Sequence, residues 1–207
     1  MNKKKTNKFL IFFLFTFIAS ISFVGGYGKG LENKGKDVLW PTEKTKTITS
    51  NFGYRKDPFG SDMMFFHNGL DIGAPTGEKI IALEDGEVIR TSFYGGYGYS
   101  ISFKGKYTNM VYLYGHLNGN FIVKKGMKVK RGDVIGEVGP TNVFNVPGNP
   151  YKDFKGRPTN GNTTGAHLHF SVIDGRKFID PMIFLRKIKN LTLKGENSWR
   201  NNKNIVY

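Results

Sequence analysis

The hydrophobic positions of this 207-residue chain form one continuous stretch and then many short ones. Residues 9–24 are almost wholly apolar and follow a start that holds four lysines among its first eight residues. A basic start followed by an apolar stretch is typical of a secretory signal, and the stretch reaches the lower length limit for crossing a bilayer. We expect residues 1–26 to form a hydrophobic helix that is either a cleaved signal peptide or a membrane anchor.

From about Trp40 the pattern changes to short runs of β-forming residues separated by turn signals. Asp85-Gly86 predicts a hairpin turn within the first run, and a second turn is expected at residues 131–133. No part of this region shows sustained helical periodicity. The expected fold is all-β, a small antiparallel sheet or flattened barrel with long loops. The predicted strand runs are residues 79–91, 99–103, 109–113, 126–138 and 166–173.

Composition divides the chain further. Residues 27–46 are rich in Gly, Lys, Asn and Thr and are expected to be a spacer, and residues 47–185 are the expected folded domain. Within the domain, residues 140–162 hold four prolines and no strand pattern, which indicates an insertion. Residues 186–207 form a basic, Asn-rich tail.

The net charge of +15 first suggests a protein that binds nucleic acid or an anionic surface. Residues 1–36 hold seven lysines and one Glu, and residues 186–207 hold six basic residues and one Glu. The charge therefore lies mainly at the two ends. Together with the export signal, this distribution argues against nucleic acid as a partner. We expect the domain to work in the periplasm or cell envelope, with the N-terminal segment as its contact to the membrane.

The chain has no cysteine and only four histidines. Without thiols, a metal would have to be held by imidazole and carboxylate groups. His167 and His169 are two apart on a predicted strand and therefore share a face, with Ser171, while Leu168 and Phe170 point to the core. A single histidine is more often structural, but two on one polar strand face favour metal binding or catalysis.

His67 and Asp71 also share a face if the chain is extended, and nearby glycines exclude a helix there. This pair alone could be a salt bridge. Combined with the His-x-His pair it predicts a zinc site, because a catalytic zinc takes three protein ligands and one open position. His116 lies at the end of another predicted strand. Four histidines and one Asp therefore supply three ligands and leave two histidines for acid–base chemistry.

At this point the sequence resembles a known family. The motifs HNGLD (67–71), YGHL (114–117) and TGAHLHF (164–170) are similar to those of the LytM/lysostaphin-type peptidases, the M23 zinc endopeptidases. The segment NFGYRKDPFG (51–60) and the framework EDGEVIR and KKGMKVKRGDVIGEVG also resemble the family. The resemblance covers roughly residues 47–185. It implies an enzyme that cuts peptide cross-links or stem peptides of bacterial peptidoglycan.

The resemblance also implies roles for single residues. His67, Asp71 and His169 match the zinc ligands, one Zn²⁺ per chain. His116 and His167 match the catalytic histidines, of which one would take a proton from water and the other would stabilise the oxyanion or protonate the leaving amine. The chain departs from the family in the 140–162 insertion, since the family usually joins these segments by a short turn. We expect the insertion to rim the cleft and shape the groove.

Two other functions are compatible with parts of the sequence. A non-catalytic LytM-type regulator of another wall hydrolase is the main alternative, although all five site residues are present. The framework at 126–138 also resembles lipoyl or biotinyl carrier modules, but it lacks their presented lysine. The sequence does not determine which peptide bond is cleaved, whether the enzyme needs an activator, or its oligomeric state.

Overall fold

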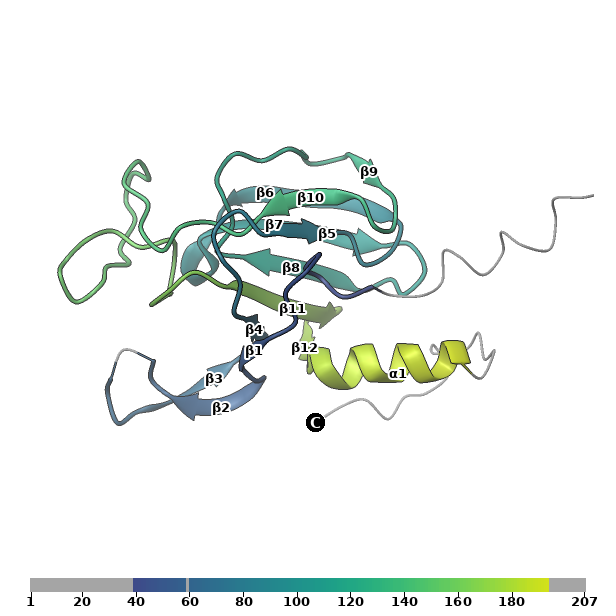
Figure 1. Cartoon of the computed structure of the whole chain (residues 1–207), viewed down its shortest axis with the longest axis horizontal. Coiled ribbons are helices and arrows are strands. Elements are labelled where there is room, and N and C mark those ends of the chain that lie inside the picture. Colours follow the sequence, from purple (N-terminus) through teal and green to yellow (C-terminus); the bar gives the residue numbers. More distant parts are fainter. Residues whose placement is uncertain (1–38, 59, 194–207) are drawn as a thin grey trace, which may run out of the picture. The chain divides into compact units, whose positions relative to one another are not determined.

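The computed structural model describes residues 39–58 and 60–193 (Figure 1). All strand pairings printed for these residues are antiparallel, which confirms the all-β expectation. The largest sheet has the order β1-β4-β11-β8-β7-β6-β9, and β12 pairs with β11. Its strands are β1 (Ile48–Ser50), β4 (Leu70–Ile72), β6 (Gly86–Phe93), β7 (Tyr99–Gly105), β8 (Val111–Gly115), β9 (Lys128–Val129), β11 (Leu168–Asp174) and β12 (Lys177–Ile179).

Two smaller sheets complete the β structure. β5 (Lys79–Ile81) pairs with β10 (Val134–Glu137), and β2 (Gly53–Lys56) pairs with β3 (Met64–His67). The β5–β10 pair lies against the large sheet, since the Tyr114 hydroxyl on β8 donates to the Ile81 carbonyl at 3.1 Å. The β2–β3 hairpin extends away from the core beside β1 and β4 (Figure 1).

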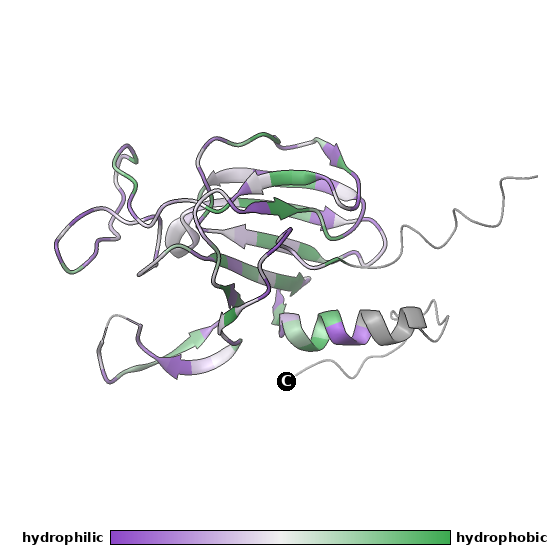
Figure 2. Cartoon of the chain, viewed as in Figure 1, coloured by the Kyte–Doolittle hydropathy of each residue, from purple (hydrophilic) through white to green (hydrophobic). Residues whose placement is uncertain are grey.

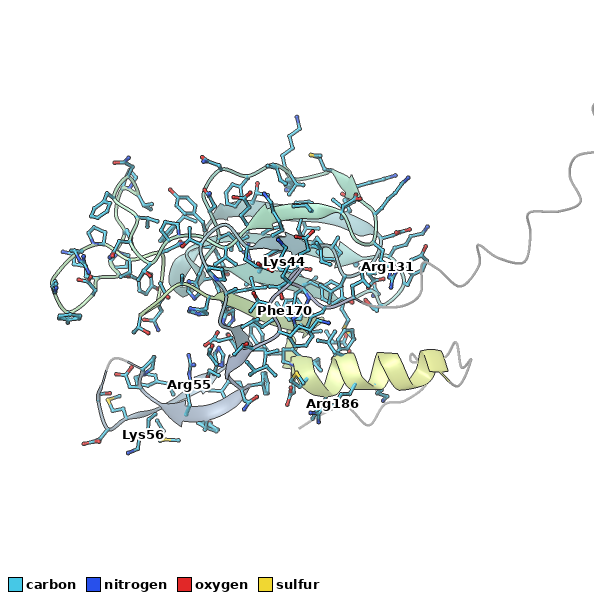
Figure 3. All side chains as sticks on the ribbon, in the orientation of Figure 1. Lys44, Arg55, Lys56, Arg131, Phe170 and Arg186 are labelled. Carbon is cyan, nitrogen blue, oxygen red and sulfur yellow. The ribbon has the colours of Figure 1, made fainter. Side chains whose placement is uncertain are left out.

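The core lies between the large sheet and the β5–β10 pair. Tyr112, Tyr114, Phe103 and Phe170 are fully buried; Tyr112 stacks on Phe170 and Tyr114 on Phe103, while the rings of Tyr114 and Phe170 meet at a tilt. Figure 2 shows the hydrophobic positions gathered on these stacked strands, and Phe170 is labelled within this layer in Figure 3. Burying aromatic residues of this size is the main stabilising contribution to a sheet of short strands.

The hairpin predicted for residues 79–91 is wrong. β5 pairs with β10 whereas β6 pairs with β7 and β9, so residues 82–85 carry the chain from one sheet to the other. The reason lies in Glu84, which is fully buried and accepts hydrogen bonds from the backbone amides of Tyr107 and Thr108 and from the Tyr112 hydroxyl. These contacts come from the β7–β8 connection and from β8 itself, so the local turn signal does not reveal them.

The C-terminal helix α1 was not expected from the sequence. α1 spans Pro181–Leu193 and so crosses the expected boundary between domain and basic tail. Asp180 caps it, because its carboxylate accepts from the amide of Met182 at 2.8 Å, and Pro181 follows as the first helical residue. Phe184 is buried and packs against Tyr112. Met182 and Leu185, on the same first turns, pack against the core beside it.

The last part of the expected spacer contacts the domain. The Leu39 amide donates to Leu83, the Ile81 amide donates to Pro41, and Thr42 forms a β-bridge with Ile80. The expected N-terminal signal or anchor and residues 194–207 of the basic tail lie outside the described residues. Among the described residues, no helix has both the length and the apolar character needed to cross a membrane.

Candidate metal centre and active-site cleft

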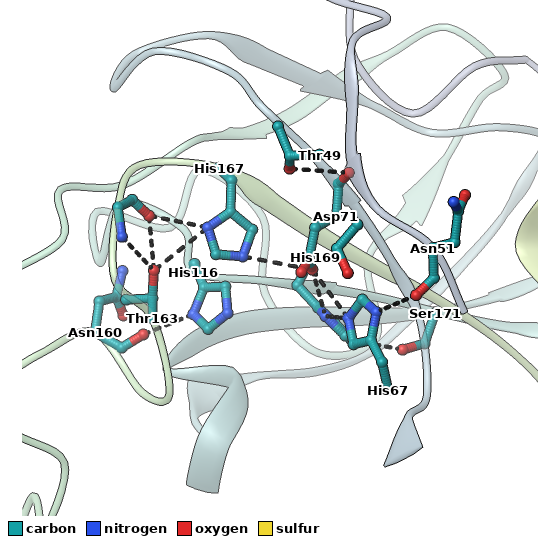
Figure 4. Close-up of polar contacts among 12 residues, drawn as sticks. Thr49, Asn51, His67, Asp71, His116, Asn160, Thr163, His167, His169 and Ser171 are labelled. Carbon is teal, nitrogen blue, oxygen red and sulfur yellow. Dashed lines mark hydrogen bonds and ion pairs between the residues drawn. The ribbon is translucent and has the colours of Figure 1, made fainter. Parts of the chain in front are cut away.

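Three predicted ligands meet at the junction of β3, β4 and β11. His67 ends β3, Asp71 is the middle residue of β4, and His169 lies opposite Asp71 in the β4–β11 register. Asp71 Oδ1 is 3.1 Å from His67 Nε2 and 3.0 Å from His169 Nδ1, and these two nitrogens are 3.1 Å apart (Figure 4). The three side chains form the described group able to hold a metal ion, and all three are buried.

The hydrogen-bond partners of His67 and His169 leave one nitrogen lone pair on each ring directed toward Asp71 Oδ1. His67 Nδ1 lies 2.7 Å from the Asn51 carbonyl, which can only accept, so Nδ1 carries the proton and Nε2 is free to ligate. His169 Nε2 lies 2.9 Å from the Ser171 hydroxyl, which can accept from it and leave Nδ1 as the ligand atom. Such outer partners are typical of histidines that bind metals.

These three donor atoms fit zinc. Two imidazole nitrogens and one carboxylate oxygen are a normal zinc ligand set, and bonds of about 2.0–2.1 Å in a tetrahedron place neighbouring ligand atoms about 3.3 Å apart. The observed separations of 3.0–3.1 Å are close to that spacing. His67 Nε2, His169 Nδ1 and Asp71 Oδ1 are all electron-pair donors in a buried site, and a cation between them would compensate for their lost contact with water.

Asp71 is held ionised. Burial alone would raise the pKa of its carboxyl, but the close contacts with His167, His169 and His67 together outweigh burial and hold that pKa well below its usual range. Asp71 Oδ2 also accepts from Arg55 Nη1 at 2.9 Å. Arg55 projects from the β2–β3 hairpin (Figure 3) and so gives Oδ2 a partner while Oδ1 faces the histidines.

The remaining two histidines stand beside this cluster. The ring of His116 lies 4.6 Å from that of His167 and 6.0 Å from that of His169, centroid to centroid. His116 follows β8 with a φ of 58°, a left-handed conformation that is uncommon for a residue with a side chain. Burial, and next the nearby His167 and His169, lower the pKa of His116 well below its usual value. His116 is therefore neutral around pH 7.

Both catalytic candidates are oriented by one short segment, residues 160–165. His116 Nδ1 lies 2.7 Å from the Asn160 carbonyl, and His167 Nδ1 lies 2.9 Å from the Gly165 carbonyl. A carbonyl cannot donate, so each Nδ1 carries a proton. His116 Nε2 is then an unprotonated nitrogen, and His167 Nε2 lies 3.4 Å from Asp71 Oδ1.

The five residues open into a cleft of about 930 Å³. One wall comes from the β2–β3 hairpin, including Arg55 and Phe65, and the opposite wall comes from Tyr97 and from residues 162–166. The structure thus brings together every site residue expected from the sequence: His67, Asp71, His116, His167 and His169. Of the 140–162 insertion, Asn162 alone is among the described residues that line the cleft.

Three residues of the site were not identified from the sequence. Arg55 belongs to the NFGYRKDPFG segment, where its alternation with Tyr54 and Lys56 was the available signal for a residue facing the site. Tyr97 places its ring 5.3 Å from that of His169, and its hydroxyl accepts from Asn68 at 2.6 Å. Asn160 is 44 residues from His116 in the sequence, and its carbonyl contacts the His116 ring. Neither of these two contacts has a local sequence signal.

Comparison with known proteins agrees with this geometry. Residues 65–181 match the model of peptidase family M23. The chain is 31% identical over 146 residues to the peptidoglycan DD-endopeptidase ShyB of Vibrio cholerae, a match that covers 69% of this chain and 29% of ShyB. ShyA from the same organism is also 31% identical, over 65% of this chain and 26% of its own length. The chain thus spans less than a third of the length of these relatives.

Solved structures show the same fold. A zinc-containing peptidase from Vibrio cholerae has a TM-score of 0.54 and 30% identity, covering 69% of this chain and 38% of its own. The catalytic domain of lysostaphin from Staphylococcus simulans has a TM-score of 0.51 and 25% identity, covering 69% of this chain and 92% of its own. The motif residues, the sheet and the family match over more than half of the chain agree, and the chain belongs to peptidase family M23.

Proposed function

We propose that this protein is a zinc-dependent endopeptidase that hydrolyses peptide cross-links or stem peptides of bacterial peptidoglycan in the cell envelope. The observation that carries the proposal is the joint arrangement of a His-Asp-His ligand group and two further histidines in one cleft. Family membership and the DD-endopeptidase relatives support the substrate class. We propose peptidoglycan peptides as the partner and the N-terminal segment as the route to the envelope.

The ligand group has a clear part in such a reaction. A zinc ion held by His67, Asp71 and His169 would supply Lewis acidity, which lowers the pKa of a water toward about 7 and polarises a carbonyl group. The protein holds the three ligand atoms in advance, through Asn51 behind His67 and Arg55 behind Asp71. Residues held in this way need no rearrangement during the reaction.

The two other histidines would move the protons. His116 is neutral, and its Nε2 has a free lone pair, so it suits the role of proton acceptor from the attacking water. His167 is the more exposed of the two, with 15% of its side chain accessible, and it contacts the Asp71 carboxylate. Its Nδ1 proton is held by the Gly165 carbonyl, so it would act as an imidazolium whose Nε2 donates a hydrogen bond to the oxyanion or a proton to the leaving amine. Peptide hydrolysis needs both proton movements.

The cleft suits an extended peptide. It is open between the β2–β3 hairpin and residues 162–166, and it exposes the Phe65 ring on the face of the hairpin that also carries Arg55 and His67. A peptide lying along this groove would place one of its carbonyl groups between the ligand group and the two catalytic histidines. Reacting groups held in this way gain much of their rate from orientation.

The test is digestion of purified sacculi by the full-length chain. We expect sacculi of defined cross-link type, either direct or through interpeptide bridges, to release new amino termini that mass spectrometry assigns to one bond. A chelator should abolish the release, and added zinc should restore it. The matched control is His116→Ala, which leaves the ligand group intact. Stoichiometric zinc without hydrolysis of any sacculus type, by a folded chain, would instead support a non-catalytic regulator.

A further inference from the structure

Asn160 occupies a fully buried position where three chain segments meet. These are the start of the 140–162 insertion, the first residue of β7, and the residues that follow β8 and include His116. The side-chain amide joins all three. Its Oδ1 accepts from the Tyr99 amide at 2.8 Å, and its Nδ2 donates to the Leu117 carbonyl at 2.9 Å and to the Pro140 carbonyl at 3.4 Å.

The main chain of Asn160 serves His116 directly. Its carbonyl accepts from His116 Nδ1 at 2.7 Å, while its own amide donates to the Thr141 carbonyl at 2.8 Å. The side chain therefore fixes the position of the peptide unit whose oxygen determines the tautomer of His116. A buried amide with both of its ends bonded to backbone groups holds its peptide unit rigidly.

Close packing allows this peptide unit little freedom. Gly98 has a φ of +63°, and a Cβ there would lie 2.3 Å from both the carbonyl oxygen and Oδ1 of Asn160. Gly161 has a φ of +73°, and a Cβ there would lie 2.3 Å from the Gly98 nitrogen. Only glycine fits at these two contacts without a shift of the backbone.

We propose that Asn160 is a positioning residue that holds His116 in the tautomer with a free Nε2. The inference rests on the proposed function only in assigning proton transfer to His116; the tautomer itself is a property of the folded protein. It also gives the insertion a role at the site, because the insertion supplies this asparagine to the catalytic side of the cleft. Through its own contacts Asn160 touches neither the ligand group nor the cleft surface.

The test compares four variants of the full-length, zinc-loaded chain, one of which, Asn160→Ser, is a partial rescue. Asn160→Ala removes the amide, and Gly98→Ala displaces the Asn160 carbonyl without changing Asn160. Asn149→Ala is the matched control, because Asn149 Nδ2 bonds the neighbouring Thr159 carbonyl at 2.8 Å and has no contact with His116. Long-range ¹H–¹⁵N correlation spectra report which nitrogen of His116 carries the proton. Zinc content and the unfolding midpoint report folding.

We expect wild type and Asn149→Ala to show His116 protonated at Nδ1. Asn160→Ala and Gly98→Ala should show a mixture of tautomers. In sacculus digestion, kcat per bound zinc should fall at least about tenfold in these two variants with KM nearly unchanged, which is part of the 10²–10⁴-fold that a positioned proton acceptor contributes. Asn160→Ser, which keeps one donor and one acceptor, should recover part of both signals.

A wild-type tautomer in Asn160→Ala, with kcat lowered only in proportion to the unfolded fraction, would overturn the proposal. If Asn160→Ala fails to fold, Asn160→Ser and Gly98→Ala decide by the same two criteria. If the wild-type chain hydrolyses no sacculus, the proposed function fails. The tautomer spectra, which need no substrate, then still decide whether Asn160 positions His116.

Discussion

Asp71 and His169, 98 positions apart in the chain, lie directly opposite each other in the β4–β11 register, with Oδ1 and Nδ1 3.0 Å apart. Two neighbouring antiparallel strands therefore place two candidate ligands side by side without any loop being involved. On the other edge of β11, His169 pairs with Gly115, the residue before His116. One strand thus aligns the ligand group with one of the two catalytic candidates.

The first prediction separates ligands from catalytic histidines. Asp71→Ala removes the oxygen that faces both ligand histidines, so we expect loss of stoichiometric zinc and of activity together. His116→Ala and His167→Ala remove no member of the ligand group and should keep zinc while activity falls about 10²-fold or more. Elemental analysis of the purified variants and sacculus digestion measure the two properties. Loss of zinc from folded His116→Ala would contradict these roles.

The second prediction concerns the partner of Asp71. Arg55→Ala leaves Oδ2 of a buried carboxylate without its donor, and loss of such an outer contact typically lowers metal affinity about 10–100-fold. Competition with a chromogenic chelator measures the zinc Kd. Lys56→Ala is the control, because Lys56 neighbours Arg55 on β2 and its side chain lies on the opposite face of the hairpin. An equal loss in both variants would indicate a general effect of hairpin charge.

The third prediction concerns the 140–162 insertion. The two ends of the insertion are paired with each other. Asn142 and Thr159 form a β-bridge, and the Val143 amide donates to the Pro158 carbonyl at 3.1 Å. We expect two glycines in place of residues 144–157 to connect Val143 and Pro158 as a short hairpin. Zinc content and the unfolding midpoint should then be preserved. The product profile or rate on sacculi should change. An unchanged profile and rate would show that the insertion does not shape the groove.

The fourth prediction concerns Glu84. All the groups that bond its carboxylate are donors, namely two backbone amides and the hydroxyls of Tyr112 and Thr108. Glu84→Gln turns an NH₂ group toward one of them, and leaving buried donors unsatisfied costs about 1–3 kcal/mol. Denaturant unfolding measures this loss. Glu87→Gln, at an exposed position on β6, should be neutral, and the zinc content of folded Glu84→Gln should match wild type.

The histidines and Asp71 were predictable because catalytic chemistry depends on residue type and short spacing. His167 and His169 are separated by one residue, and the alternation of a strand already places them on one side, with Leu168 and Phe170 buried on the other. Tyr97 and Asn160 were not predictable, and for Arg55 alternation along its strand gave a face but no partner. Each acts through a partner 16 or more positions away, and no spacing rule connects such residues.

The hairpin error has the same origin. Asp85-Gly86 is a valid local turn signal, yet the buried contacts of Glu84 send the strands on either side of it into different sheets. Helix α1 begins at a cap from Asp180 and is held by Phe184, which packs against Tyr112 of β8, a contact between segments far apart in the chain.

The sequence by itself determined the fold class and the five residues of the site, because these follow from alternation and from the chemistry of side chains. Their division into zinc ligands and catalytic histidines was implied by the resemblance to the M23 family and stays a prediction. Tertiary structure alone decided how the strands divide between sheets, which carbonyl orients each histidine, and how the end of the insertion reaches His116. Those features depend on contacts between distant segments, whose free energy is settled only when the whole domain packs.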